Sequence, residues 1–251
     1  MIKKIHRFIF LDSLKQKKLF IKENIFNDKD ENFTVLFRII NKTVKNYANY
    51  YILDIGAYDG MSSVYFSKHF PQNKIIAFEP NKVSFQNALN NCRKNANISI
   101  HNIALSEKSG FSEFNITKNA VSSSLNSISG ESAIIYGYSD ELSIIEKTVA
   151  ETKPLDDFEL DNEILFIKID TQGNEIKVLD GAKKTLNNTL FVLVKMSNHD
   201  MYVNGCIYYE VDNWFRTNGF KLVDVIILSR KNGIIATEFD AIYANQNKVP
   251  L

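Results

Sequence analysis

The residues Asp54-Ile55-Gly56-Ala57-Tyr58-Asp59-Gly60 decide the fold of this 251-residue chain. A short apolar run at 51–53 precedes them and fits a buried parallel strand. The two glycines permit a tight turn that other residues resist, and a helical pattern follows until Pro71. A second apolar run at 74–78 leads into Glu79. Strand, glycine loop, helix, strand and acid together predict one βαβ unit of the kind that binds nucleosides.

The composition of the glycine loop distinguishes between nucleosides. A dinucleotide site uses the pattern G-x-G-x-x-G, because the backbone must approach a pyrophosphate closely. Here the spacing is G-x-x-x-G, and Asp59 adds a carboxylate that would repel phosphate. S-adenosylmethionine has no phosphate and carries a cationic sulfonium, so this loop suits it better than NAD. Glu79 lies about 20 residues beyond the loop, where such units hold a ribose. An ordinary strand-to-helix turn is the alternative interpretation.

Composition and charge narrow the class of protein. With 30 basic and 29 acidic residues the net charge is +1, which gives no electrostatic case for a nucleic-acid partner. Cys92 and Cys206 lack C-x-x-C spacing, so we expect neither a disulfide framework nor a zinc cluster, and a reducing, cytoplasmic location. We also expect no transmembrane segment. The sequence leaves the oligomeric state open, a homo-oligomer included.

The chain is predicted to contain one main domain. Residues 1–49 are basic and are expected to form an N-terminal helical extension, with a helix packed against the domain rather than on a membrane surface, and a second helix over 33–47. Residues 50–251 are expected to form the domain itself. Its further predicted strands are 98–103, 111–116, 164–169, 189–196, 221–228 and 236–244, the last two joined at Asn232-Gly233. Its further predicted helices are 82–95, 176–186 and 208–218. The Ser- and Gly-rich stretch 121–138 is either a substrate-lining loop or a disordered insertion.

Six motifs, in chain order, resemble those of the FkbM-type methyltransferases, and the resemblance covers about residues 50–220. They are Asp54-Ile55-Gly56-Ala57-x-x-Gly60, Ala77-Phe78-Glu79-Pro80, Ala104-Leu105-Ser106, Ser123-Ser124-Leu125, Leu155-Asp156 and Lys168-Ile169-Asp170-x-Gln172-Gly173-x-Glu175. The resemblance implies a Rossmann-like class I methyltransferase fold, an α/β architecture with a mostly parallel seven-stranded sheet and helices on both faces. It also implies S-adenosylmethionine as donor and methyl transfer to a hydroxyl of a small molecule, sugar, glycan or secondary metabolite.

The resemblance, together with the loop chemistry, assigns one set of residues to the cofactor. These are Asp54, Gly56, Ala57, Tyr58, Gly60, Glu79, Pro80, Ala104, Leu105, Ser106 and Asp170. Two residues depart from the family pattern, since many members carry Asn at the place of Tyr58 and Glu at the place of Lys195. The second departure keeps open an alternative function, a non-catalytic nucleoside-binding module of the same fold.

The chemistry requires alignment and removal of one proton, because the sulfonium is already a good leaving group. Asp170 follows the strand beside the cofactor strand and is the first candidate base, with a capping or cofactor-orienting carboxylate as its alternative. His199 is the second candidate, and a surface-loop histidine is its alternative. Lys195 is either a solvated charge or an anchor for an anionic acceptor such as a nucleotide sugar. Asp170 and Glu175 could hold a divalent ion, but no histidine joins them at ligand spacing, so we assign no metal site.

Overall fold

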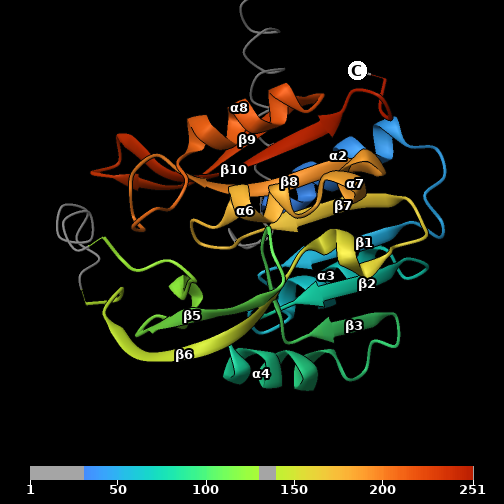
Figure 1. Ribbon diagram of the computed structural model, residues 1–251. Coiled ribbons are helices and arrows are strands. Elements are labelled where there is room, and N and C mark those ends of the chain that lie inside the picture. Colours follow the sequence, from blue (N-terminus) through green and yellow to red (C-terminus); the bar gives the residue numbers. More distant parts are fainter. Residues whose placement is uncertain (1–30, 130–139, 251) are drawn as a thin grey trace, which may run out of the picture. The chain divides into compact units, whose positions relative to one another are not determined.

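The computed structural model describes residues 31–129 and 140–250 (Figure 1). The chain divides into two compact units, Met1–Lys42 and Thr43–Leu251. The first unit is described from residue 31 onward, as helix α2 (Glu31–Thr43), which replaces the predicted helix over 33–47 and ends four residues earlier. The helix predicted closer to the start lies outside the described residues. Within the described ranges, no helix has both the length and the apolar character that crossing a bilayer requires.

The second unit is built on a seven-stranded sheet with the order β3-β2-β1-β7-β8-β10-β9 (Figure 1). Its strands are β1 (Tyr51–Ile55), β2 (Lys74–Phe78), β3 (Ile98–His101), β7 (Ile164–Ile169), β8 (Thr189–Ser197), β9 (Phe220–Lys231) and β10 (Ile235–Asn245). Neighbouring strands from β3 to β8 pair in parallel, and β10 is antiparallel to both β8 and β9. The predicted mostly parallel, Rossmann-like sheet is therefore confirmed. The strand order reverses between β1 and β7, which is where open α/β sheets bind their ligands.

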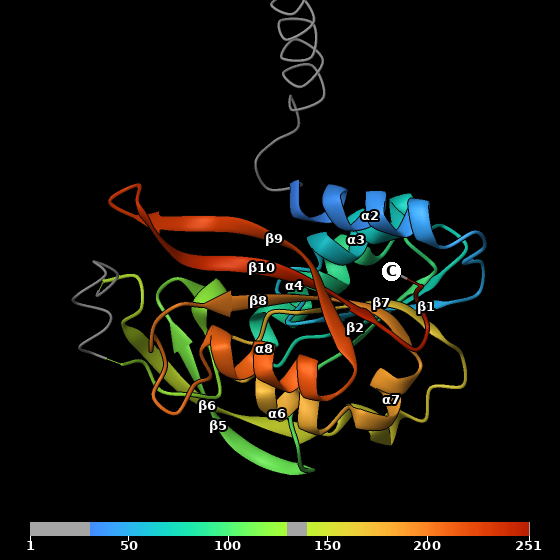
Figure 2. The same ribbon diagram turned by 90° about the horizontal axis from the view of Figure 1, so that it is seen from above.

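Helices cover both faces of this sheet (Figure 2). Helices α3 (Met61–His69) and α4 (Lys82–Cys92) lie on one face, and α6 (Glu175–Asp180), α7 (Lys183–Asn187) and α8 (Tyr208–Thr217) lie on the other. Asn81 caps α4, because its side-chain oxygen accepts hydrogen bonds from the amides of Val83 and Ser84, as expected for an N-terminal Asn. The single helix predicted over 176–186 is two short helices, α6 and α7.

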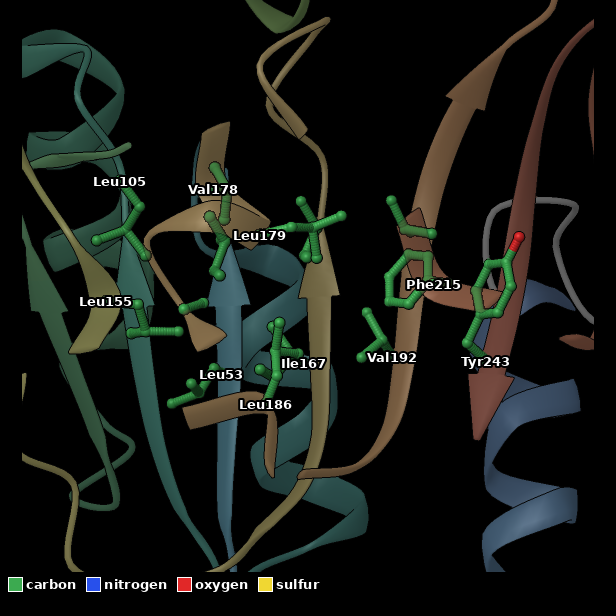
Figure 3. Packing of buried hydrophobic residues seen from close by; sticks show 14 of the residues in the cluster. Leu53, Leu105, Leu155, Ile167, Val178, Leu179, Leu186, Val192, Phe215 and Tyr243 are labelled. Atoms are coloured by element: carbon green, nitrogen blue, oxygen red, sulfur yellow. The ribbon is translucent and has the colours of Figure 1, made fainter. Parts of the chain in front are cut away.

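The main core lies between the sheet and α6–α8 (Figure 3). Leu53, Ile167 and Val192 come from three neighbouring parallel strands and point toward Leu179 and the other buried residues of these helices. Side chains alternate along a strand, so the residues directly before and after Leu53, Ile167 and Val192 in their own strands point to the other face of the sheet, toward α3 and α4. On β1, for example, Leu53 lies in this core, whereas Asp54 points to the opposite face and contacts α3.

A second, three-stranded sheet was not predicted. It consists of β4 (Ala104–Leu105), β5 (Gly110–Thr117) and β6 (Ile144–Lys153) in the order β4-β6-β5. The 3₁₀ helix η1 (Ala120–Ser122) lies between β5 and β6 in sequence, and the 3₁₀ helix η2 (Leu155–Phe158) follows β6. Of the predicted long loop, the structure describes residues 121–129. In this part Ser124 forms an isolated antiparallel β-bridge with Asn115 of β5, and Ile128 forms another with Tyr202. Residues 130–138 of that loop lie outside the described residues.

Candidate active site

A pocket opens at the carboxyl ends of β1, β2 and β7, where the strand order reverses. We call it the strand-end pocket. Seven of the residues that sequence reasoning assigned to the cofactor line it, namely Gly56, Tyr58, Glu79, Pro80, Ala104, Leu105 and Asp170.

The other four assigned residues do not line this pocket, and these are Asp54, Ala57, Gly60 and Ser106. Asp54 is fully buried on the face of the sheet that α3 covers. One carboxylate oxygen accepts hydrogen bonds from Ser62 at 2.5 Å and Ser63 at 2.7 Å, and the other accepts from Nζ of Lys168 at 3.1 Å. Asp54 is therefore engaged by the protein itself and joins β1, β7 and α3.

The loop after β1 is shaped by its contacts with the neighbouring strands. The amides of Gly56 and Ala57 both donate to the carbonyl of Phe78 at 3.0 Å, and Lys168 Nζ donates to the carbonyl of Gly56 at 2.8 Å. Gly56 has φ +77°, and a Cβ atom there would lie 2.0 Å from the carbonyl oxygen of Asp170. A side chain at position 56 would thus collide with the end of β7 before it met any ligand.

Glu79 is the most constrained carboxylate of the strand-end pocket. Its Oε2 accepts a hydrogen bond from the amide of Tyr58 and its Oε1 accepts one from the amide of Asn81, both at 2.8 Å. Burial raises its pKa to about 7, although the two amides and the charge of Lys168 act in the opposite direction. Each oxygen keeps further lone-pair capacity, so the fixed carboxylate can accept hydrogen bonds from a pair of neighbouring hydroxyl groups.

The lining of the pocket includes apolar side chains in and next to β4 and β5, together with polar ones. Ile103, Phe114 and Leu125 are apolar, and Ser123 and Asn174 are polar. Nδ2 of Asn174 donates to the carbonyl of Leu105 at 3.2 Å, whereas its buried Oδ1 has no hydrogen-bond partner within the described part of the chain. Sequence reasoning missed Asn174, which was an unassigned position in a recognised motif. A buried acceptor without a partner calls for a donor from a ligand or a water.

Asp170 lines the pocket directly after the end of β7. Its backbone amide donates to the carbonyl of Ile55, and its Oδ1 accepts a hydrogen bond from Gln172 Nε2 at 3.1 Å. Nζ of Lys195 lies 4.0 Å from the same oxygen. Asp170 is thus a partly exposed carboxylate held in one orientation by an amide and an ammonium.

Glu175 does not share a ligand site with Asp170. It is buried, and its Oε1 accepts hydrogen bonds from the amides of Thr171 and Gly173, while its Oε2 accepts one from Cys206 Sγ. Burial raises the pKa of Glu175. These contacts of Glu175 hold the turn after β7. Within the described ranges, we find no group of three or more His, Cys, Asp or Glu side chains that could bind a metal ion.

A second pocket adjoins the first, and Gln172 lines both. We call it the Lys195 pocket, and its polar lining includes Gln172, Glu175, Lys195, Ser197, His199, Asp200, Tyr202 and Glu238. His199 lies here and not in the strand-end pocket, so the two candidate bases occupy neighbouring pockets. Burial lowers the pKa of His199. Ser197 Oγ donates to the carbonyl of His199 and lies 3.3 Å from its Nδ1.

Lys195 is partly buried and held by carboxylates. Its Nζ lies 3.1 Å from Oε1 of Glu238, which comes from β10. Burial alone would lower its pKa, but the charges of Asp170 and Glu238 outweigh burial and raise it. Lys195 is therefore a permanent cation whose charge is compensated within the protein.

A family model described as the methyltransferase FkbM domain matches residues 54–222. The 2-O-methyltransferase NoeI of Sinorhizobium fredii is 27% identical over 161 residues, a match that covers 60% of this chain and 65% of that protein. The chain thus spans less than two thirds of that relative's length.

Solved structures of methyltransferases also resemble the chain. The precorrin-6y C5,15-methyltransferase of Geobacter metallireducens aligns with 10% identity and a TM-score of 0.47, covering 82% of this chain and 85% of that one. TrmK of M. capricolum, solved with S-adenosyl-homocysteine, aligns with 12% identity and a TM-score of 0.44, covering 85% of this chain and 68% of that one.

Proposed function

Because the chain belongs to the FkbM methyltransferase family, we propose that it transfers a methyl group from S-adenosylmethionine to a hydroxyl oxygen of a sugar, glycan or secondary metabolite. The observation that carries the proposal is Glu79, a carboxylate fixed by two amides in a pocket at the reversal of strand order. Such a carboxylate suits the two hydroxyl groups of a ribose. When bound, S-adenosylmethionine supplies the methyl group on a cationic sulfonium.

The lining of the strand-end pocket fits a nucleoside in one direction. Its apolar side chains Ile103, Phe114 and Leu125 suit a purine base. Asn174 also lines this pocket, and we infer that its unpartnered Oδ1 turns toward an N–H donor of the ligand, such as the exocyclic amine of adenine. With the ribose at Glu79, the sulfonium end would lie toward Asp170 and the Lys195 pocket.

This direction defines what the protein's own residues would do in the transfer. Asp170, between the two pockets, would accept the proton of the acceptor hydroxyl as the nucleophile forms. Gln172 would hold the carboxylate of Asp170 in place through its Nε2. His199, which burial favours in the neutral form, is the second group able to accept that proton.

The test has a binding part and a transfer part. Calorimetry with S-adenosylhomocysteine, S-adenosylmethionine and NAD should show binding of the first two and none of NAD. Methyl-labelled S-adenosylmethionine, incubated with a mixture of glycans and small hydroxyl compounds, should then label an acceptor. Tight binding of NAD would overturn the proposal. Binding of S-adenosylhomocysteine without transfer to any acceptor would instead favour the non-catalytic nucleoside-binding module.

A further inference from the structure

We propose that the Lys195 pocket receives the methyl acceptor and selects hydroxyl compounds that carry no phosphate or other anionic group. The proposal rests on the proposed methyltransferase function and adds to it the charge class of the substrate. Its basis is the arrangement of charges around Lys195, which sequence reasoning had left open as an anchor for an anionic acceptor.

Two side chains, those of Gln172 and Asp170, connect the Lys195 pocket to the strand-end pocket. Gln172 lines both pockets, and it donates to Asp170 on one side while accepting a hydrogen bond from the hydroxyl of Tyr202 at 2.7 Å on the other. Asp170 in turn lies 4.0 Å from Lys195. A compound in the Lys195 pocket would therefore present a hydroxyl group to Asp170, next to the sulfonium end of the nucleoside.

The charges in this pocket are unfavourable for an anion. Lys195 is the one cationic side chain among the described residues that line it. Glu238 at 3.1 Å and Asp170 at 4.0 Å already compensate its charge, and Asp200 adds a further carboxylate to the lining. Carboxylates thus outnumber ammonium groups. A phosphate at Lys195 would lie close to Glu238 and Asp170, and their negative charges would repel it.

The same side chains are favourable for neutral hydroxyl groups. Carboxylates act only as acceptors when ionised, so Glu238 and Asp200 can each accept hydrogen bonds from O–H donors. Lys195 keeps ammonium protons that can donate to a hydroxyl or ether oxygen. A neutral compound with several hydroxyl groups satisfies this set of donors and acceptors without adding a charge.

The charge argument is tested with simple phosphate probes. We would titrate inorganic phosphate and glucose 1-phosphate into the full chain loaded with S-adenosylhomocysteine, and compare the wild type with Glu238→Gln. Removing the carboxylate should expose Lys195 and tighten phosphate binding by about tenfold or more. The double variant Lys195→Met/Glu238→Gln should lose this gain. Glu113→Gln removes the carboxylate of an exposed ion pair with Lys147 and should bind phosphate as the wild type does.

Equal phosphate affinity in the wild type and Glu238→Gln would overturn the proposal, and so would a gain that survives in the double variant. If S-adenosylhomocysteine failed to bind the wild type, the proposed function would fail, and the phosphate comparison would be made on the unloaded chain. Methyl transfer gives an independent readout, with labelled S-adenosylmethionine offered to a neutral glycan pool and to a pool of sugar phosphates and nucleotide sugars. Faster labelling of the phosphate-bearing pool would overturn the proposal as well.

Discussion

The carbonyl oxygen of Asp170 lies 2.0 Å from the point where a Cβ atom on Gly56 would stand. The loop after β1 and the end of β7 are therefore packed backbone against backbone at the reversal of strand order. Such a contact holds Asp170 and the loop in a fixed relation, because neither segment can shift without the other. A side chain introduced at position 56 should consequently disturb the backbone of the pocket as well as ligand binding.

We expect Gly56→Ala to destabilise the fold by more than the conformational strain of its positive φ, which alone costs about 1–3 kcal/mol. The collision with Asp170 adds to that strain and should also abolish binding of S-adenosylhomocysteine. Gly233→Ala is the matched control, since its φ is +68° but nothing lies within 4 Å of the added Cβ. Urea unfolding of both variants would contradict the prediction if their free energies of unfolding fell equally.

Lys168→Met should be strongly destabilising because it leaves the buried carboxylate of Asp54 without its ammonium partner. Lys168 and Asp54 are 13% and 0% exposed in their side chains. Removing one partner of a buried pair costs about 3–5 kcal/mol. Lys147→Met breaks an ion pair of similar length whose side chains are about half exposed, and such pairs contribute about 0–1 kcal/mol. Similar losses in urea unfolding for both variants would contradict a structural role for Asp54.

The sequence predicted the βαβ unit and the sheet because these follow from local patterns, namely apolar runs, two glycines and Pro71. It did not predict β6, whose residues are mostly exposed and include several charges, so no apolar alternation marks it. β6 is a strand because it pairs with β5 along its length. This pairing is a tertiary contact that no local pattern reveals.

The candidate site was predictable to a similar extent. Residues at the strand ends could be assigned to the pocket from the sequence. Asp54 was also assigned to the ligand, although its neighbours Leu53 and Ile55 belong to the core on the face of the sheet opposite to Asp54. Strand alternation was the signal that could have corrected this. The compensation of Lys195 by Glu238 was beyond sequence reasoning, since the two residues come from antiparallel neighbours, β8 and β10.

Binding of S-adenosylhomocysteine should strengthen as the pH rises through about 7. Burial raises the pKa of Glu79 from 4.5 to about 7, and only the ionised carboxylate accepts hydrogen bonds through both oxygens. Below pH 7 each pH unit should weaken binding by up to about tenfold. Calorimetry across pH 5.5–8.5 measures the slope, which should be absent in Glu79→Gln. An equal slope in that variant would assign the titration to another group.

The same carboxylate should make the free energy of unfolding depend on pH. Because its folded pKa lies above its unfolded value, its stabilising contribution is fully present below pH 4.5 and is lost as the pH rises through 7. Glu79→Gln should therefore unfold with a weaker loss of stability between pH 4.5 and 7 than the wild type.

Asn174→Leu should reduce discrimination between an amino and an oxo group on the purine base. In the wild type we expect S-adenosylhomocysteine to bind about tenfold more tightly than S-inosylhomocysteine, since one hydrogen bond contributes about 1 kcal/mol and a facing oxygen would repel the buried Oδ1. Asn115→Leu is the control, because Asn115 also has a buried unpartnered oxygen but does not line the strand-end pocket. A preference that survives in Asn174→Leu would mean that another group recognises the amine.

Asp170→Asn should leave the fold intact and lower the rate of methyl transfer by about 10²-fold or more, the range for loss of a general base. The substitution keeps the size of the side chain and still offers an oxygen to Gln172 Nε2. It removes the charge that would take up the acceptor proton. His199→Ala should cost less, because His199 does not line the strand-end pocket, in which we propose that the methyl donor binds.

Single-turnover transfer at saturating S-adenosylmethionine separates this chemical effect from cofactor binding. A near-normal rate for Asp170→Asn would mean that alignment alone drives the transfer. A large loss in His199→Ala with a normal rate in Asp170→Asn would mean that His199 is the base. The reacting hydroxyl group would then lie next to His199 in the Lys195 pocket.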